Sequence, residues 1–160
     1  MKNQEMVDAL EWNAVILENF IGQIPESRLH LKRGEGFWTV YQHVYHLALV
    51  QPVMFKRFRA FRTDEKPVIV PVNPFGKEEK KGAEARPVAE IVQSFKDWRK
   101  KQVELIRACD DSVWKKQGLH PEYDQYTMEI LIRHVLTHDG FHMYRMEELW
   151  LAKDEVLTKL

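Results

Sequence analysis

Apolar residues recur at steps of three and four in four separate segments of this chain, and this spacing constrains the fold more than any other feature. The first stripe contains five apolar positions, with Asn13 in the remaining slot. These positions are Met6, Leu10, Leu17, Phe20 and Ile24. A stripe of this period marks one face of an amphipathic helix. The first helix is therefore predicted to span this segment, with Pro25 following its end.

The second helix is predicted to begin near Thr39. Thr39 and Gln42 have the spacing of a capping box, which satisfies the free amides at a helix start. We expect this helix to run to about Phe58, with a kink at Pro52, because the proline ring removes one backbone donor and crowds the preceding turn. Residues 37–55 hold no charged side chain, but polar residues and a proline interrupt them. This pattern predicts a helix buried in protein rather than a membrane span.

Residues 60–86 show no helical period and are predicted to form a long connector. The third helix is predicted from a stripe of core positions: Val88, Ile91, Phe95, Trp98, Gln102, Leu105 and Cys109. The basic residues elsewhere on its cylinder are expected to form a solvated charged face: Lys96, Arg99, Lys100, Lys101 and Arg107. The fourth helix is predicted to run from about Thr127 towards Val156.

Four amphipathic helices without a convincing strand period predict an all-α four-helix bundle. A length of 160 residues corresponds to one domain, here residues 1–160. The single cysteine excludes an intramolecular disulfide framework, and acidic residues occupy the place where a secretory signal has its apolar core, so the cytoplasm is the expected location. The 24 basic and 24 acidic residues give zero net charge, which argues against a nucleic-acid partner.

The distribution of the histidines is the main clue to function. His43 and His46 lie on the second predicted helix, and His134, His138 and His142 lie on the fourth. At about 100° per residue, His138 and His142 fall in the middle of the apolar stripe, whereas His134 falls near its edge. Two imidazoles one turn apart can meet one metal ion, and a third from a facing helix would complete a three-histidine site. Periodicity leaves open whether that third ligand is His43 or His46. The alternative to a metal site is a metal-free bundle in which the histidines only pack against their neighbours.

The chain lacks the residues that several other kinds of catalytic or binding site require. No Glu in the chain has a His three residues on, which excludes a di-iron bundle of the Glu-x-x-His type. The sequence HDGFH resembles the H-E-x-x-H of zinc proteases, but Asp139 is one methylene shorter than Glu. No G-x-S-x-G turn, P-loop or dinucleotide fingerprint is present, and Cys109 is expected to pack rather than to act as a nucleophile.

Two segments, WTVYQHVYHL (residues 38–47) and HVLTHDGFHMYRM (residues 134–146), resemble the signatures of the DinB/YfiT-like family of metalloenzymes. Members of that family pair a Trp-Ser/Thr helix start with a His-Leu about eight residues on, and carry His-x-x-x-His on the last long helix. The resemblance implies that His46, His138 and His142 bind the metal. It also implies an up-down-down-up bundle, in which the long connector lets the second and third helices run parallel.

The family resemblance implies a divalent-metal-dependent enzyme that acts on a small molecule, by thiol transfer or hydrolysis. Characterised relatives include transferases that use low-molecular-weight thiols, a mycothiol-dependent isomerase and hydrolases. Imidazole ligands favour Zn²⁺ or Ni²⁺, and three protein ligands leave one position open for water or substrate. The alternative function is a non-catalytic metal-binding or scaffold bundle that acts by association.

Arg145 stands where the family has a Gln, about one turn beyond His142. We expect Arg145 either to pair with a carboxylate such as Glu148 or to clamp an anionic group of the substrate beside the metal. The long amphipathic helices and five Trp residues favour a homodimer.

Overall fold

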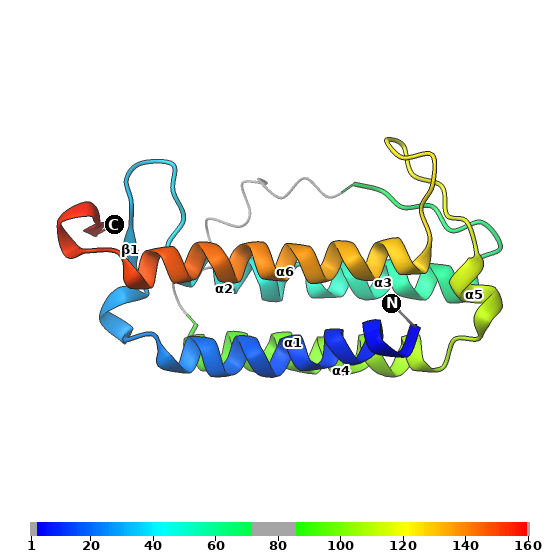
Figure 1. Ribbon diagram of the computed structural model, residues 1–160, viewed down its shortest axis with the longest axis horizontal. Coiled ribbons are helices and arrows are strands. Elements are labelled where there is room, and N and C mark those ends of the chain that lie inside the picture. The colour runs from blue at the N-terminus through cyan, green and yellow to red at the C-terminus, as the bar shows by residue number, and fades with distance from the viewer. Residues whose placement is uncertain (1–2, 72–85, 160) are drawn as a thin grey trace.

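The computed structural model describes residues 3–71 and 86–159. Its long helices lie side by side along one axis (Figure 1). They are α1 (Asn3–Gln23), the consecutive helices α2 (Val40–Leu49) and α3 (Gln51–Thr63), α4 (Val88–Arg107) and α6 (Met128–Leu151). α1 and α6 run in one direction, and α2, α3 and α4 run in the other (Figure 1). The predicted all-α, up-down-down-up four-helix bundle is therefore confirmed.

The helices pack around two groups of buried apolar side chains that lie at opposite ends of the bundle. α1 packs against α4 and α6, and the α2–α3 pair packs against the same two helices. One cluster uses the first half of α1, α3, the second half of α4 and the first half of α6. The other uses the second half of α1, α2, the first half of α4 and the end of α6. Between these clusters each long helical segment contributes buried polar residues, which form a polar layer across the middle of the bundle: Asn13, Gln51, Arg99, Gln102 and Asp139.

The start of α2 confirms the predicted capping box. The Thr39 hydroxyl accepts a hydrogen bond from the Gln42 backbone N–H at 3.1 Å, and the Gln42 side-chain oxygen accepts from the Thr39 N–H at 2.9 Å. The predicted kink takes the form of a break at Val50, after which Pro52 stands in the first turn of α3, where its missing N–H costs nothing. α3 then extends to Thr63, beyond the predicted end.

Two predicted boundaries and one predicted surface residue are wrong. Helix α3 ends at Thr63 rather than at the predicted Phe58, because Phe58 is fully buried and the next turn still packs into the core through Phe61. α6 ends at Leu151, short of the predicted Val156, because Ala152 adopts an extended conformation. Arg99 does not belong to a solvated face, since only 1% of its surface is exposed.

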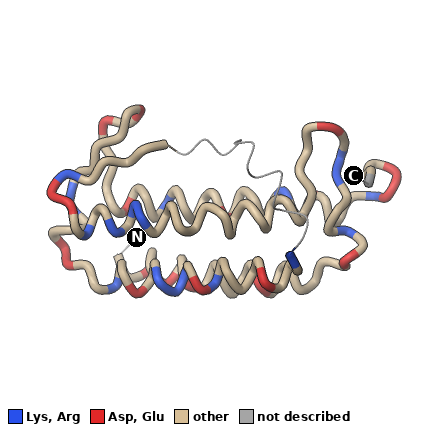
Figure 2. Tube along the Cα trace, turned by 180° about the vertical axis from the view of Figure 1, so that it is seen from behind, with Lys and Arg blue, Asp and Glu red and all other residues tan. Residues whose placement is uncertain are grey.

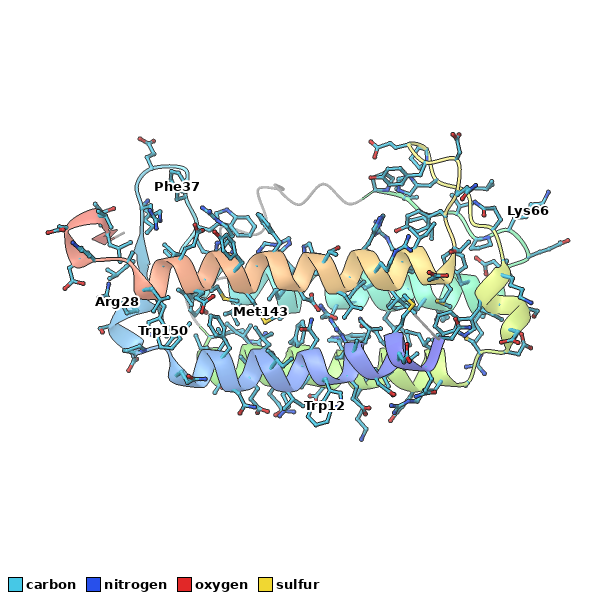
Figure 3. The ribbon with its side chains drawn as sticks, viewed as in Figure 1. Trp12, Arg28, Phe37, Lys66, Met143 and Trp150 are labelled. Carbon is cyan, nitrogen blue, oxygen red and sulfur yellow. The ribbon has the colours of Figure 1, made fainter. Side chains whose placement is uncertain are left out.

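The end of α6 is fixed by contacts with the loop after α1. Arg28 donates a hydrogen bond to the Ala152 carbonyl at 3.1 Å and pairs with Asp154 at 2.6 Å (Figure 3). Beyond this point β2 (Thr158–Lys159) pairs antiparallel with β1 (Leu31–Lys32). This two-residue ladder is too short to produce a strand period in the sequence. Short 3₁₀ turns flank it at Glu26–Arg28 and Asp154–Val156.

The opposite end of the bundle is closed by α5 (Asp111–Lys115) and two loops. Asp110 caps α5 by accepting from the Ser112 and Val113 N–H groups. The described start of the predicted connector lies along the loop before α6, where Ile69 donates to the Leu119 carbonyl at 2.8 Å. Residues 72–85 of the predicted 60–86 connector lie outside the described residues.

In the lower pair of helices in Figure 2, α1 carries only acidic charges, whereas α4 carries charges of both signs. Trp12, which is 64% exposed, points away from the bundle on this side (Figure 3). Among the helices that the structure describes, none combines the length and apolar content needed to cross a membrane.

Candidate metal centre

Three histidines converge in the middle of the bundle, at the interface of α2 and α6. One ring nitrogen from each of His46, His138 and His142 lies within 4.8 Å of the other two. The Nε2 atoms of His46 and His138 are 3.2 Å apart. The structure thus brings together all three of the metal-ligand candidates taken from the sequence.

The helices place these side chains through simple geometry. His138 and His142 are one turn apart on α6, so both rings project from the same face. α2 is packed against that face and contributes His46. His46 and His142 are buried, whereas 35% of the His138 side chain is exposed. Access to the cluster is therefore from the His138 side.

Burial keeps His142 in the protonation state that a metal ligand requires. Burial, reinforced by the neighbouring His138, His43 and His46 rings, lowers the pKa of His142 to about 2. His142 is therefore a neutral imidazole at physiological pH, which is the form that coordinates a metal ion.

His43 lies behind His142 rather than in the converging group. The Nδ1 atoms of His43 and His142 are 2.8 Å apart, so one of the two rings donates its N–H to the other. Burial, followed by the charge of Arg145 and the nearby His46, lowers the pKa of His43 to about 4. The Trp38 ring covers this group, with its centroid 5.2, 5.1 and 5.7 Å from the ring centroids of His43, His46 and His142.

Asp139 connects the histidine cluster to the polar layer of the bundle. Its Oδ2 accepts hydrogen bonds from Arg99 at 2.7 Å and from Asn13 at 2.9 Å. Its buried Oδ1 has no hydrogen-bond partner among the described residues, and it lies 3.7 Å from the Nδ1 of His138. Burial alone would raise the pKa of Asp139, but the Arg99 guanidinium and the neighbouring His138 together outweigh it, and the pKa is lowered. An ionised carboxylate therefore faces the outer nitrogen of His138.

Two glutamines complete the polar layer. Gln51 Oε1 accepts from Arg99 Nη2 at 3.3 Å and from Gln102 Nε2 at 3.0 Å. Gln102 Nε2 also lies 3.1 Å from the Gln51 carbonyl, and Arg99 Nη1 donates to the Leu10 carbonyl at 3.2 Å. This network joins all four segments of the bundle next to the histidines.

The donor set fits a divalent transition metal. Neutral imidazole nitrogens are the ligands that zinc, nickel and copper prefer, and metal-bound histidines usually donate their other N–H to a carboxylate or similar acceptor. The unpartnered Asp139 Oδ1 beside His138 supplies such an acceptor. The His43–His142 contact supplies a second fixed partner for a ligand ring.

Arg145, the candidate substrate-binding residue, lies near the cluster but is already paired. Its guanidinium donates to the Glu148 carboxylate at 2.5 Å, and its charge contributes to the low pKa of His43. The pairing with Glu148 is one of the two outcomes expected from the sequence. A role in binding substrate stays a prediction.

Two residues outside the cluster behave as the sequence predicts. His134, expected at the edge of the stripe, has its Nδ1 3.2 Å from the Tyr126 hydroxyl. Cys109 is partly buried, its thiol donates to the Leu105 carbonyl at 3.3 Å, and burial raises its pKa. A thiol with a raised pKa is a poor nucleophile, in agreement with a packing role.

A cavity of about 250 Å³ adjoins the cluster on its accessible side. His138 and Asp139 form part of its wall, and the remaining wall comes from the α2–α3 junction, α3, α6 and Tyr126. Sequence reasoning missed this cavity and the polar layer. The signal for the polar layer was present, because Asn13 and Gln102 stand in otherwise apolar stripes.

Comparisons with known proteins agree with this description. A family model described as the DinB superfamily matches residues 9–146. YfiT of Bacillus subtilis (strain 168) is 24% identical over 149 residues, which cover 92% of this chain and 84% of YfiT. The solved structure described as "YfiT from Bacillus subtilis is a probable metal-dependent hydrolase with an unusual four-helix bundle topology" matches with a TM-score of 0.81 at 23% identity, covering 92% of this chain and 85% of that one. At this identity the structural likeness establishes a shared fold.

Proposed function

The chain belongs to the DinB superfamily, and from its converging histidines we propose that it is a divalent-metal-dependent enzyme that hydrolyses a small molecule. The observation that carries the proposal is the approach of one ring nitrogen from each of His46, His138 and His142 to within 4.8 Å of the others. The relative YfiT, described as a probable metal-dependent hydrolase, supports hydrolysis over thiol transfer.

We propose His46, His138 and His142 as the ligands, with Zn²⁺ or Ni²⁺ as the ion. Closed structural zinc sites use four protein ligands, whereas three leave a position for water or substrate. An ion bound in this way supplies a Lewis acid and lowers the pKa of a water towards about 7.

The surrounding residues of the chain hold the ligands in place. Asp139, fixed by Arg99 and Asn13, presents its free oxygen towards His138 and favours the tautomer with a proton on Nδ1. The Nε2 of His138 is then left as the lone-pair donor. His43 holds Nδ1 of His142 in the same manner, which leaves the opposite nitrogen of that ring for the ion.

The cavity beside His138 favours an enzyme over the alternative of a non-catalytic metal-binding scaffold. A scaffold needs no space next to its ion, whereas a catalyst must admit a substrate to the open position. Here about 250 Å³ of space reaches the most exposed of the three histidines. A low-molecular-weight thiol substrate, a homodimer, a cytoplasmic location and a single domain over residues 1–160 stay predictions from the sequence.

The proposal is tested by screening the purified chain against esters and amides after removal of metal and after reloading with Zn²⁺ or Ni²⁺. We expect hydrolysis only after reloading, loss of hydrolysis in His142→Ala, and wild-type hydrolysis in His30→Ala, which removes an exposed histidine from a loop. Equal hydrolysis before and after metal loading would refute a metal-dependent function.

A further inference from the structure

The cavity beside the histidine cluster extends away from it along the interface of α3 and α6. One end is formed by Gln51, His138 and Asp139, and the far end is formed by Arg57, Tyr126 and His134. The remaining wall is apolar and comes from Val50, Met54, Leu131 and Val135. The cavity thus has polar groups at both ends and an otherwise apolar wall.

Helix geometry gives the length of this space. His138 and Leu131 both line the cavity and are separated by seven residues of α6, which corresponds to about 10 Å at about 1.5 Å per residue. On the opposite wall, Gln51 and Arg57 are separated by about 9 Å on the same basis. An extended chain of about eight or nine carbons has this length, because C–C bonds advance about 1.25 Å each, well below the 3.3–3.6 Å advance of a peptide residue.

Arg57 is the uncompensated charge of the cavity. Its guanidinium donates to the Val70 carbonyl at 2.5 Å and to the Met54 sulfur at 3.8 Å. Among residues 3–71 and 86–159, no carboxylate forms an ion pair with Arg57. A guanidinium has five N–H donors, so these two contacts leave donors available for an anion.

The other titratable groups of the lining do not neutralise Arg57. The Asp139 carboxylate is engaged by Arg99 at 2.7 Å. Burial raises the pKa of the Tyr126 hydroxyl and lowers the pKa of His134, so both stay uncharged at neutral pH. The far end of the cavity therefore carries one net positive charge.

We propose that this cavity is the substrate site and that it takes an extended, mainly aliphatic carboxylate, whose anionic end pairs with Arg57 while its other end lies at His138. The identity of the occupant as a substrate rests on the proposed function, whereas its binding chemistry rests on the cavity alone. A planar guanidinium matches a carboxylate through two parallel hydrogen bonds, and the apolar wall covers the aliphatic chain. Arg145, which pairs with Glu148, does not line this space.

Calorimetric titration of the full chain with octanoate and with octan-1-ol tests the proposal. Both probes have the length of the cavity, and they differ in the charge at one end. We expect Arg57→Gln to weaken octanoate binding about tenfold or more and to leave octan-1-ol binding unchanged. Arg59→Gln is the matched control, because Arg59 is an exposed arginine on the same helix. We expect it to bind both probes as the wild type does.

Two further variants test the apolar wall of the cavity and the arginine outside it. Leu131→Trp replaces a wall residue by a bulkier one and should abolish binding of both probes, with folding checked by circular dichroism. Arg145→Gln should bind octanoate as the wild type does. The proposal is overturned if octanoate binds the wild type and Arg57→Gln equally, if it binds neither, or if Arg145→Gln weakens it instead.

A parallel Zn²⁺ titration separates this inference from the proposed function. We expect Arg57→Gln to bind Zn²⁺ as the wild type does, because Arg57 is not in the converging group. Charge-dependent octanoate binding without Zn²⁺ binding would refute the metal enzyme and leave the carboxylate site standing. Zn²⁺ binding together with charge-independent octanoate binding would refute the carboxylate site and leave the metal enzyme standing.

Discussion

Replacement of Arg99 by Met should destabilise the protein severely, although the substitution creates no large cavity. Arg99 is 1% exposed, and its Nη2 lies 2.7 Å from the Asp139 carboxylate. Its removal leaves that carboxylate buried with only the neutral Asn13 amide as a partner on Oδ2. Loss of one partner of a buried ion pair costs about 3–5 kcal/mol. In a chain of this length each kcal/mol lowers the melting temperature by about 2–4 °C, so we expect a decrease of about 10 °C.

The pH dependence of the destabilisation by Arg99→Met tests whether it comes from the buried Arg99–Asp139 ion pair. In the wild type Arg99 keeps the pKa of Asp139 below its ordinary value, so the stabilisation is fully present at neutral pH and is lost as the pH falls through the folded-state pKa. In Arg99→Met the charge that opposes burial most strongly is gone, so we expect burial to raise the pKa of Asp139 above its ordinary value. Proton uptake then stabilises the folded variant, and the cost should shrink by up to about 1.4 kcal/mol for each pH unit between 7 and 5.

Urea unfolding followed by circular dichroism at pH 7 and pH 5 measures both effects. Lys100→Met is the matched control on the exposed face of α4 and should change stability by less than about 0.5 kcal/mol. The double variant Arg99→Met/Asp139→Leu removes both charges and should recover most of the lost stability. A cost below about 1 kcal/mol for Arg99→Met, or a cost that does not change with pH, would refute the buried ion pair as the cause.

Three further outcomes follow from the structure. A metal bound only by the folded state stabilises it by about 2.7 kcal/mol at a hundred times its dissociation constant, so a chelator should lower the melting temperature of the metal-loaded protein in calorimetry, and an unchanged value would count against the site. His43→Ala removes the partner 2.8 Å from His142 and should weaken Zn²⁺ binding about 10- to 100-fold in a competition titration, whereas His30→Ala should have no effect. Gly118→Ala should cost about 1–3 kcal/mol in urea unfolding, because the new Cβ would lie 2.9 Å from Phe61 Cζ and 3.2 Å from the Tyr126 carbonyl oxygen; Gly140→Ala, with no neighbour within 4 Å, should not destabilise the chain.

The helices and their order could be predicted because their signals are local or come from a family pattern. The Thr39–Gln42 capping box acts within one turn, and the structure has it as the sequence indicates. The end of α6 is different. It depends on the hydrogen bond from Arg28, in a segment distant in sequence, to the Ala152 carbonyl. The residues around Ala152 contain no local pattern that predicts this contact.

The misplacement of Arg99 has a physical reason. A stripe counted at one residue per turn follows only the centre of a buried face. With Ile91 as zero and about 100° per residue, Arg99 falls at about 80°, between the buried Ile106 at about 60° and Val92 at about 100°. Helix α4 is buried over a wider arc than its stripe, because both α1 and the α2–α3 pair pack against it.

The candidate site was predictable only in part. His138 and His142 share a helix face, and that relation follows from their spacing alone. Their approach to His46 depends on the packing of α2 against α6, which the family resemblance implied but periodicity did not. The cavity with Arg57 at its far end depends on how α3 and α6 meet, and no single segment encodes that geometry.

The proposed chemistry depends on one divalent ion bound between His46, His138 and His142. Crystals of the full chain grown with Zn²⁺, measured at the zinc absorption edge, test this binding most directly. We predict one anomalous peak per chain at about 2.0–2.1 Å from one ring nitrogen of each of the three histidines. A peak bound elsewhere, or no peak between these residues at saturating Zn²⁺, would contradict the assignment.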